Sequence, residues 1–315
     1  MSIVNQLSHI RKGDTVGIRR PDMTVGSMRA MGHLAAAAKS GRLLIGGLFL
    51  LAGFSFDAQA HATDGVTLDA TYIIAISGLT IGRADVKGRF TDRGYAAAIS
   101  GSTYGVSRIV SDARATLAGA GRVVGNNVLP ASYNLATSES GFETSVSMTM
   151  RGGSIVGLQA IPSLPLASDR VPLTPASKQN VVDPVGAFVV ALDHPGAPDP
   201  NTACNRTVKV FDGWKRFDIR LSYKETKAID DGGDAYAGDL IVCSARYLPV
   251  AGHRTGDDSV AFMADNKRLE ISLAHVKGTN YLVPYRILIG TRLGDLTISA
   301  RTFTTTGTQQ QARAD

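Results

Sequence analysis

The stretch "VTLDATYIIAISGLTIGRADVKGRF" (Val66 to Phe90) decides the fold of this chain. Apolar and polar residues alternate on both sides of a turn that contains Gly78. Successive side chains of a β-strand point to opposite faces, so each half predicts a strand with one face on a core and the other on solvent. The turn between the halves predicts a hairpin.

The residues on either side of this hairpin extend the β pattern along the chain. Small residues interrupt it between 95 and 123, where Gly101, Gly105, Gly119 and Gly121 indicate bends or bulges. The pair Gly152-Gly153 predicts a turn between two strands. In the second half we predict strands over Arg206–Phe211, Lys215–Lys224, Gly238–Tyr247, Ala264–Lys277, Leu282–Thr291 and Gly294–Thr305.

The middle of the chain is different. A proline-rich loop precedes "DPVGAFVVALDH" (Asp183 to His194), which predicts a short helix because Pro184 fits a first helical turn and Asp183 can cap it. We therefore expect a mainly β protein. Its fold would be a single large, strongly curved antiparallel sheet, an open barrel or a β-spiral, with one short helix. The β domain would cover residues 61–305, followed by a polar tail at 306–315.

An N-terminal leader is predicted over residues 1–60. Lys39 and Arg42 precede an apolar run, Leu43 to Phe56, that has the length of a secretory signal and is short for a transmembrane span. Two small-x-small patterns predict cleavage after Ala60 or Ala62. The alternative is an uncleaved signal anchor. The apolar run begins late, which suggests that translation starts at a later methionine.

The leader also explains most of the chain's positive charge. The whole chain has 33 Lys+Arg and 27 Asp+Glu, a net charge of +6, and seven of the basic and three of the acidic residues fall in residues 1–60. The remainder is close to neutral, at +2. Its charge therefore does not support nucleic-acid binding. No second apolar span follows the leader, so we expect no transmembrane helix in the mature chain.

The two cysteines, Cys204 and Cys243, both follow the leader. Export to an oxidising compartment favours a disulfide between them, and closing a loop of about 40 residues would stabilise the fold by roughly 3–4 kcal/mol. A catalytic thiol would need a neighbouring base, and a zinc site would need a second pair of ligands. We expect neither, and we expect no metal or other cofactor.

The remaining candidate residues each allow a structural and a functional interpretation. Trp214 follows the Asp-Gly turn and would cover an end of the sheet or stack on a ligand. His253 and the adjacent Arg254 would lie on the surface or in a site. Asp183 and Pro184 have two interpretations. In the structural one, they only begin the helix. In the functional one, the proline-rich loop and the helix, which carries Phe188 on its apolar stripe, form a lid over the mouth of the sheet. The acidic loop containing Asp230, Asp231, Asp234 and Asp239 does not match a calcium loop.

Four segments carry a family resemblance, and they occur in this order: "YIIAISGLTIGRADV", "RVPLTPASKQNVVDPVGAFVVAL", "CNRTVKVFDGWKRFDIRLSY" and "CSARYLPVAGHR". With this set the chain resembles family 3108 of the domains of unknown function, found in exported bacterial proteins. That family has no assigned reaction, so the resemblance implies no catalytic residue. The architecture is also similar to the envelope integrity protein B family, a periplasmic open, spiral-like β-sheet with one disulfide, although the cysteine spacing here is much shorter.

These observations favour a non-enzymatic periplasmic protein that supports the cell envelope. It would bind a lipid-like molecule, a polymer or an envelope protein on the concave face of the sheet. One alternative is an enzyme acting on envelope polymer or lipid, which a pair of acidic residues in a deep cleft would favour. The other is a scaffold whose edge strands recruit a partner. The sequence leaves the ligand and the oligomeric state open.

Overall fold

The computed structural model describes residues 65–109, 111–193, 198–230 and 235–307. The predicted leader, Asp231, Asp234 and residues 308–315 of the predicted tail lie outside these ranges. The strands are β1 (Val66–Ile76), β2 (Leu79–Thr91), β3 (Gly94–Thr103), β4 (Arg114–Val124), β5 (Asn127–Glu139), β6 (Phe142–Arg151), β7 (Ser154–Ile161), β8 (Val190–Ala191), β9 (Thr207–Phe211), β10 (Arg216–Asp230), β11 (Ala237–Ala251), β12 (Leu269–His275), β13 (Tyr281–Thr291) and β14 (Gly294–Gly307).

The described strands form one antiparallel sheet, in the order β7-β6-β5-β4-β3-β2-β1-β14-β13-β12-β11-β10-β9, with β8 paired to β13. Consecutive strands pair within β1–β7 and within β9–β14, and β1 pairs with β14, which joins the two groups. Strand β7 lies at one edge and β9 at the other. The mainly β fold predicted from the alternation is therefore confirmed, and so is the strongly curved open sheet expected together with the family resemblance.

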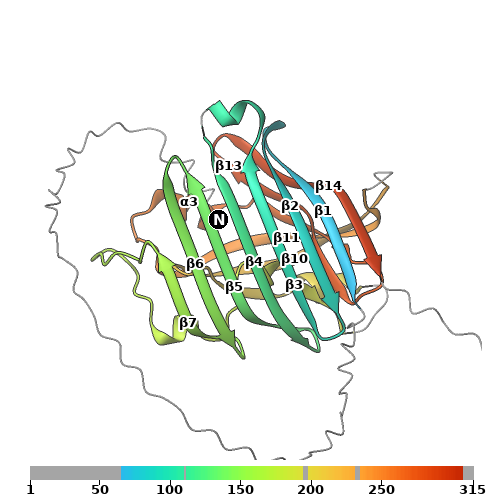
Figure 1. Cartoon of the computed structure of the whole chain (residues 1–315), viewed down its shortest axis with the longest axis horizontal. Coiled ribbons are helices and arrows are strands. Elements are labelled where there is room, and N and C mark those ends of the chain that lie inside the picture. The colour runs from blue at the N-terminus through green and yellow to red at the C-terminus, as the bar shows by residue number, and fades with distance from the viewer. Residues whose placement is uncertain (1–64, 110, 194–197, 231–234, 308–315) are drawn as a thin grey trace, which may run out of the picture. The chain divides into compact units, whose positions relative to one another are not determined.

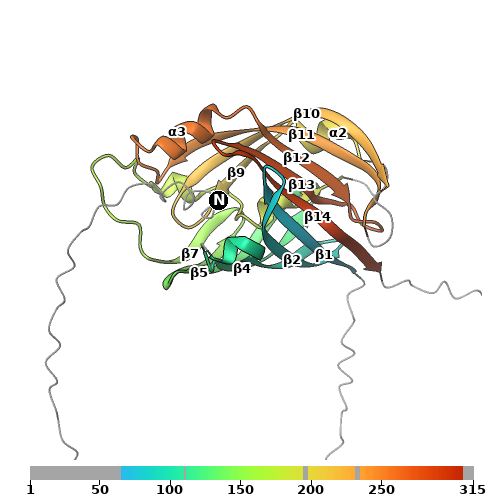
Figure 2. The same ribbon diagram turned by 90° about the horizontal axis from the view of Figure 1, so that it is seen from above.

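The sheet curves until its two halves face each other, β1–β7 on one side and β10–β12 on the other (Figures 1 and 2). The main core lies between them. Leu68, Phe90 and Tyr133 come from the first half and meet Tyr281 and Phe303 from the second. The ring centroids of Phe90 and Tyr281 are 5.1 Å apart, and the Tyr281 hydroxyl donates to the carbonyl oxygen of Thr91 at 2.9 Å. This buried hydroxyl is therefore satisfied across the core.

Residues 181–192, which we call the central segment, run from one edge of the sheet into the core. The amide of Val182 donates to the carbonyl of Lys209, and the amide of Phe211 donates back to Val182. Farther along, Ala191 in β8 pairs with Tyr281. The central segment thus fills part of the interior that an open barrel would leave for a ligand.

The helix predicted over Asp183 to His194 is wrong. The structure has a three-residue 3-10 turn, η3 (Gly186–Phe188), followed by strand β8. The physical reason is the tight fit of this segment. A Cβ on Gly119 of β4 would lie 2.7 Å from the Cβ of Val185, and the four residues 189–192 are all buried. A helix exposes one face, whereas this stretch packs on all sides.

Among the described residues, two α-helices occur at other places, α2 (Pro200–Cys204) and α3 (Asp258–Asp265). Each begins at an aspartate whose carboxylate accepts backbone hydrogen bonds, Asp199 for α2 and Asp257 for α3. The end of α3 overlaps the strand predicted to begin at Ala264, so β12 begins later, at Leu269. Within the described ranges, no helix has the length and apolar character needed to cross a membrane.

The proline-rich loop crosses from the end of β7 toward the connection between β11 and α3. It includes the 3-10 turn η2 (Pro175–Lys178). The amide of Val171 donates to the carbonyl of His253, and the amide of Gly252 donates back to Val171. Arg170 adds a side-chain hydrogen bond to the carbonyl of Gly252 at 2.7 Å. The loop is therefore held against a part of the chain about 80 residues away.

Candidate binding surface

Strands β2–β6 separate their side chains onto two faces. One alternate set faces the core, with Val86, Ile99, Leu117, Leu135 and Val146 all in the main core cluster or packed against it. The other set faces away from the core, because successive residues of a strand point to opposite sides. Nearly all residues of this outer set are short.

The pairing register aligns these outer residues in three rows that cross the strands. Most members are alanine, serine, threonine or asparagine, and the charged members lie on β2. The rows are Ile161, Ser145, Ala136, Thr116, Ser100 and Asp85; Gln159, Ser147, Asn134, Ala118, Ala98 and Lys87; and Thr149, Ser132, Ala120, Ala96 and Arg89.

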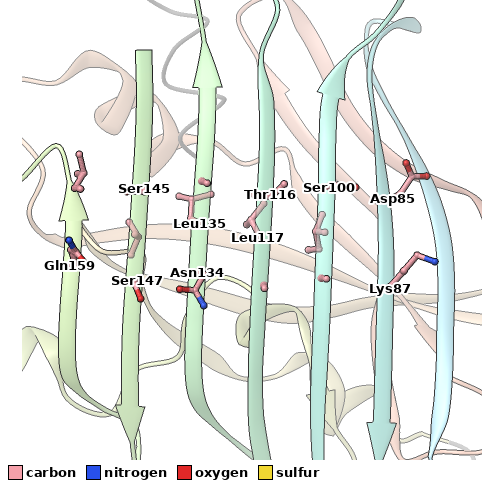
Figure 3. A pocket seen from close by; sticks show the side chains of 16 residues that line it. Asp85, Lys87, Ser100, Thr116, Leu117, Asn134, Leu135, Ser145, Ser147 and Gln159 are labelled. Atoms are coloured by element: carbon pink, nitrogen blue, oxygen red, sulfur yellow. The ribbon is translucent and has the colours of Figure 1, made fainter. Parts of the chain in front are cut away.

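The short side chains leave the outer face hollowed. Two adjoining hollows, of about 560 and 410 Å³, share Lys87, Ala98, Ala118 and Asn134 in their lining. We call the two together the trough. Figure 3 shows the labelled lining residues on neighbouring strands from β7 to β2. Between its ends the floor is built of side chains of one to four heavy atoms, whereas the β7 end carries Gln159 and the β2 end carries the longer chains of Lys87 and Arg89.

Exposed ion pairs lie at the β2 end of the trough. The Lys87 ammonium is 3.1 Å from a carboxylate oxygen of Asp69, and the Arg83 guanidinium is 3.3 Å from Asp85. Ion pairs exposed to this degree contribute about 0–1 kcal/mol, so a ligand could replace either partner at little cost. The hydroxyls of Ser100, Thr116, Ser145 and Ser147 supply both donors and acceptors along the rows.

The trough therefore offers hydrogen bonds, methyl contacts and charges at one end. No histidine or cysteine is among the residues that line it. A serine or threonine hydroxyl reacts as a nucleophile only when a base takes its proton, and histidine is the usual base. The lining is suited to holding a ligand.

Asp183 lies in the core and not in a lid. It is fully buried, and its Oδ1 accepts hydrogen bonds from the amides of Val185 at 2.8 Å and Gly186 at 3.0 Å. Burial raises the pKa of this carboxyl to about 6, although the two amides act in the opposite direction. Its Oδ2 and the hydroxyl of Tyr95 both lie beside Gly186, and neither has a hydrogen-bond partner among the described residues.

The other residues predicted for a ligand or lid surface are spread over the loops. Pro184 is half-buried next to Asp183, and Phe188 is exposed. The Trp214 Nε1 donates to the carbonyl of Pro162 at 2.8 Å, so this ring joins the β9–β10 turn to the end of β7. His253 is half-buried, and its pKa is lowered first by burial and then by Lys215.

Arg254 forms an exposed ion pair with Asp169, with 2.8 Å between Nε and Oδ2. The backbone of Trp214 lies against Gly252, the residue before His253, because a Cβ on Gly252 would be 2.1 Å from the carbonyl oxygen of Trp214. None of the six residues predicted for a ligand or lid surface lines the trough. The structure thus places Trp214, His253 and Arg254 near the proline-rich loop and Asp183 in the core.

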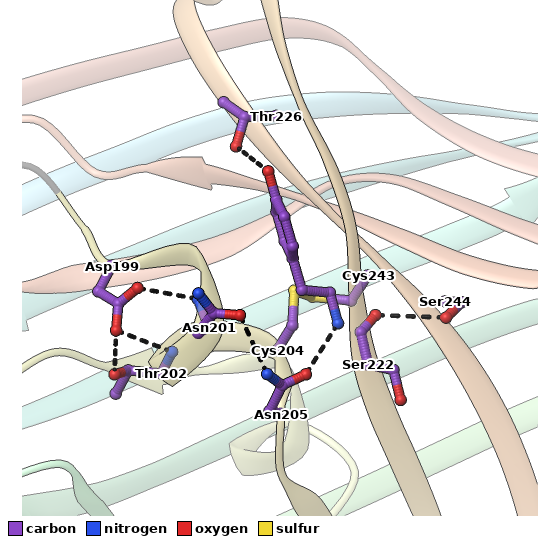
Figure 4. Close-up of a disulfide and its surroundings, with 10 residues drawn as sticks. Asp199, Asn201, Thr202, Cys204, Asn205, Ser222, Thr226, Cys243 and Ser244 are labelled. Atoms are coloured by element: carbon purple, nitrogen blue, oxygen red, sulfur yellow. Dashed lines mark hydrogen bonds between the residues drawn. A yellow bond between two sulfur atoms is a disulfide. The ribbon is translucent and has the colours of Figure 1, made fainter.

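The Cys204–Cys243 disulfide is present and joins α2 to β11 (Figure 4). Both cysteines are fully buried, and their Cα atoms are 5.4 Å apart. The side chain of Asn205 accepts a hydrogen bond from the amide of Tyr223 at 3.0 Å, which fixes the end of α2 against β10. Disulfide and hydrogen bond together hold this helix on the sheet.

Sequence reasoning missed the trough, although its signal was present. The glycines between 95 and 123 were interpreted as bends, and a register shift does occur between Ala120 and Gly121. The more informative feature was the row of alanines, serines and threonines at alternate positions. Only the register shows that these residues lie side by side on one face.

Comparison with known proteins gives a family and no named activity. No curated protein is significantly similar to this chain. Among solved structures, the chain is similar to a beta-barrel-like protein of the domain of unknown function DUF1849 from Brucella abortus, with 10% identity and a TM-score of 0.43 over 78% of this chain and 98% of that one. A family model described as "Protein of unknown function (DUF3108)" matches residues 69–301. Because the match covers most of its length, the chain belongs to the DUF3108 family.

Proposed function

We propose that this is an exported, non-catalytic protein of the periplasm that supports the cell envelope by holding a glycan strand in the trough. One observation carries the proposal. Three rows of short, mostly uncharged side chains cross strands β2–β6 on the face that points away from the core, and two of the rows continue onto β7. This surface differs from the concave surface expected from the sequence, because the core and the central segment fill the interior.

The dimensions of the trough favour an extended ligand. Neighbouring strands are about 4.8 Å apart, so the distance from β2 to β7 is about 24 Å. A single small molecule would occupy a fraction of that length. A glycan strand lying across the strands would place successive sugars over successive strands.

The chemistry of the trough favours a glycan over a lipid. Acyl chains bind in enclosed apolar cavities that remove them from water. The trough is open to solvent, and its rows include the hydroxyls of Ser100, Thr116, Ser145 and Ser147 and the amide of Asn134. Sugars carry donors and acceptors on every ring, which such groups can satisfy. The alanines let the sugar rings approach the sheet closely.

The periplasmic location is supported by two features that do not involve the trough. The sequence predicts a cleaved leader, and the Cys204–Cys243 disulfide is of a kind that persists in oxidising compartments. A periplasmic protein meets envelope glycan directly. An envelope role follows from that location together with the proposed ligand.

Co-sedimentation with purified peptidoglycan sacculi tests the proposal. The exported chain should pellet with sacculi, and Ala118→Trp should weaken binding at least about tenfold, or about 1.4 kcal/mol, because the indole would fill the middle of the trough. Ala131→Trp is the matched control, since Ala131 is exposed on β5 and does not line the trough.

Two results would contradict the proposal. One is a wild-type chain that stays in the supernatant at every sacculus concentration. The other is equal binding by the Ala118→Trp and wild-type chains. Phosphatidylglycerol vesicles are the parallel probe. A chain that binds these vesicles and not sacculi would show that the ligand is a lipid surface and not a glycan.

A further inference from the structure

Strand β7 forms an edge of the sheet that the rest of the described chain leaves open. It pairs with β6 on one side. On the other side its backbone makes no hydrogen bond with any described residue. The chain is held only just beyond its two ends, where Gly153 accepts from the amide of Val181 and Pro162 accepts from Trp214. Every second residue of β7 therefore presents an unpaired N–H and C=O at the edge.

The opposite edge of the sheet is covered. The central segment forms a parallel bridge from Val182 to Val210 of β9, with backbone hydrogen bonds on both sides of Val182. A new strand could not pair there without displacing that segment. Beyond Arg220 the outer side of β10 also has no described strand partner, but that stretch carries Lys224, Glu225 and Lys227, and such charges oppose strand pairing. Strand β7 is therefore the uncharged edge that is available for pairing.

The sequence of β7 lacks the usual protection of an edge strand. "SIVGLQAI" has no charged residue and no proline, the two commonest devices that prevent edge pairing. Val156 is 58% exposed and Ile161 is 52% exposed, so apolar surface surrounds the open backbone groups. A register shift leaves Val156 without a partner on β6, because Thr149 pairs with Gly157 and Met150 with Ile155, and residues 157–161 form the regular stretch of the edge. Such a strand is suited to accept another strand.

We propose that the partner is β7 of a second copy of this chain, paired antiparallel about a two-fold axis. Because β7 is the uncharged open edge among the described strands, a second copy is expected to pair β7 with β7, and an assembly that uses this edge alone closes at a dimer. If both edges were open, head-to-tail pairing would continue into filaments. The absence of charge on β7 also removes like-charge repulsion between identical strands.

The dimer would extend the binding surface, and this part of the inference rests on the proposed function. The trough ends at β7, where Gln159 and Ile161 are its last lining residues. Across the two-fold axis the same two residues of the second copy would follow. Two troughs would then form one continuous surface on a joined sheet, suited to a polymer longer than one trough.

The expected dimer is weak. One strand of eight residues and its neighbours bury less surface than a permanent dimer interface requires. The protein should therefore be in a monomer–dimer equilibrium that depends on concentration. Sedimentation velocity of the exported chain, without polymer, measures it directly.

The test compares two valine-to-lysine variants. Val156→Lys puts a lysine on the β7 edge, the residue type that natural edge strands use against pairing, and should raise the dimer dissociation constant at least about tenfold. Val124→Lys is the matched control, because Val124 is 60% exposed at the far end of β4. It should leave the equilibrium unchanged. Equal urea midpoints for the two variants would exclude misfolding.

A second measurement locates the interface. In hydrogen exchange, the β7 amides of the wild-type chain should become more protected as protein concentration rises, while those of β4 should not. A chain that stays monomeric at all concentrations would overturn the proposal, as would a dimer that Val156→Lys leaves intact. The Ala118→Trp chain should still dimerise, so loss of glycan binding and loss of dimerisation are separate outcomes.

Discussion

At the scale of single residues, Asp183 shows how the core tolerates a carboxylate. Its Oδ1 accepts two backbone amides that the turn at Gly186 would otherwise leave unpaired. Its Oδ2 is buried without a partner among the described residues. An unpaired buried oxygen is costly when the group is charged and much less so when it is protonated. Burial therefore raises the pKa of Asp183 to about 6.

This raised pKa predicts a pH dependence of stability. The native state holds the proton more tightly than the unfolded state, whose pKa is near 3.9. The free energy of unfolding should therefore fall as pH rises from about 4 to about 6, by roughly 3 kcal/mol from this group. Asp183→Asn keeps an acceptor for both amides and carries no charge. The free energy of unfolding of Asp183→Asn should therefore not show this fall between about pH 4 and about pH 6.

Urea unfolding of both chains between pH 4 and pH 8 is the measurement. The gain of Asp183→Asn over wild type should be small at pH 4 and largest above pH 6. Burial also raises the pKa of Asp212, but this group is common to both chains and cancels in the difference. Asp69→Asn, at an exposed ion pair, is the control. A difference that does not vary with pH would contradict the assignment to Asp183.

At the scale of elements, the strands could be predicted because alternation is a local signal. The second hairpin half, Leu79–Thr91, has the predicted burial pattern. The helix predicted at Asp183 failed because the same apolar spacing also fits a segment buried on all sides. A local pattern cannot show that Gly119 lies under Val185 and leaves no room for a helix. The trough was missed for the same reason, since rows across strands depend on register.

The disulfide is an element-scale feature whose pairing could be predicted, because the chain has only two cysteines after the leader. It joins α2, a helix of five residues, to the central part of β11. Such a short helix is unstable alone. The bond closes a loop with a sequence separation of 39, which restricts the unfolded chain.

Replacing both cysteines by serine should therefore lower the free energy of unfolding by about 4 kcal/mol. Chemical denaturation of the wild-type and Cys204→Ser/Cys243→Ser chains measures the loss. Wild type treated with a reductant should match the double variant. An unchanged midpoint in both experiments would show that the bond contributes nothing to stability.

At the scale of the whole molecule, the pairing of β1 with β14 could not be predicted from the sequence. Hairpins join strands that are neighbours in the chain, whereas β1 and β14 are more than 200 residues apart. Their pairing brings the two halves together and leaves β7 and β9 as edges. The trough and the open edge are therefore both properties of the complete sheet. They meet at β7, where one strand would serve both the ligand and the dimer.

This shared strand predicts that glycan binding depends on glycan length. A glycan fragment no longer than one trough would contact one copy, so wild-type and Val156→Lys chains should bind it equally. A strand long enough to cross both troughs would bind the second copy as an intramolecular step, at a high effective concentration. The wild-type chain should then bind it at least about tenfold more tightly than Val156→Lys. Affinities for size-fractionated peptidoglycan glycan strands, measured by isothermal titration calorimetry, would show the difference. Val124→Lys should follow wild type at both lengths, and equal length dependence in all three chains would mean that the troughs act singly.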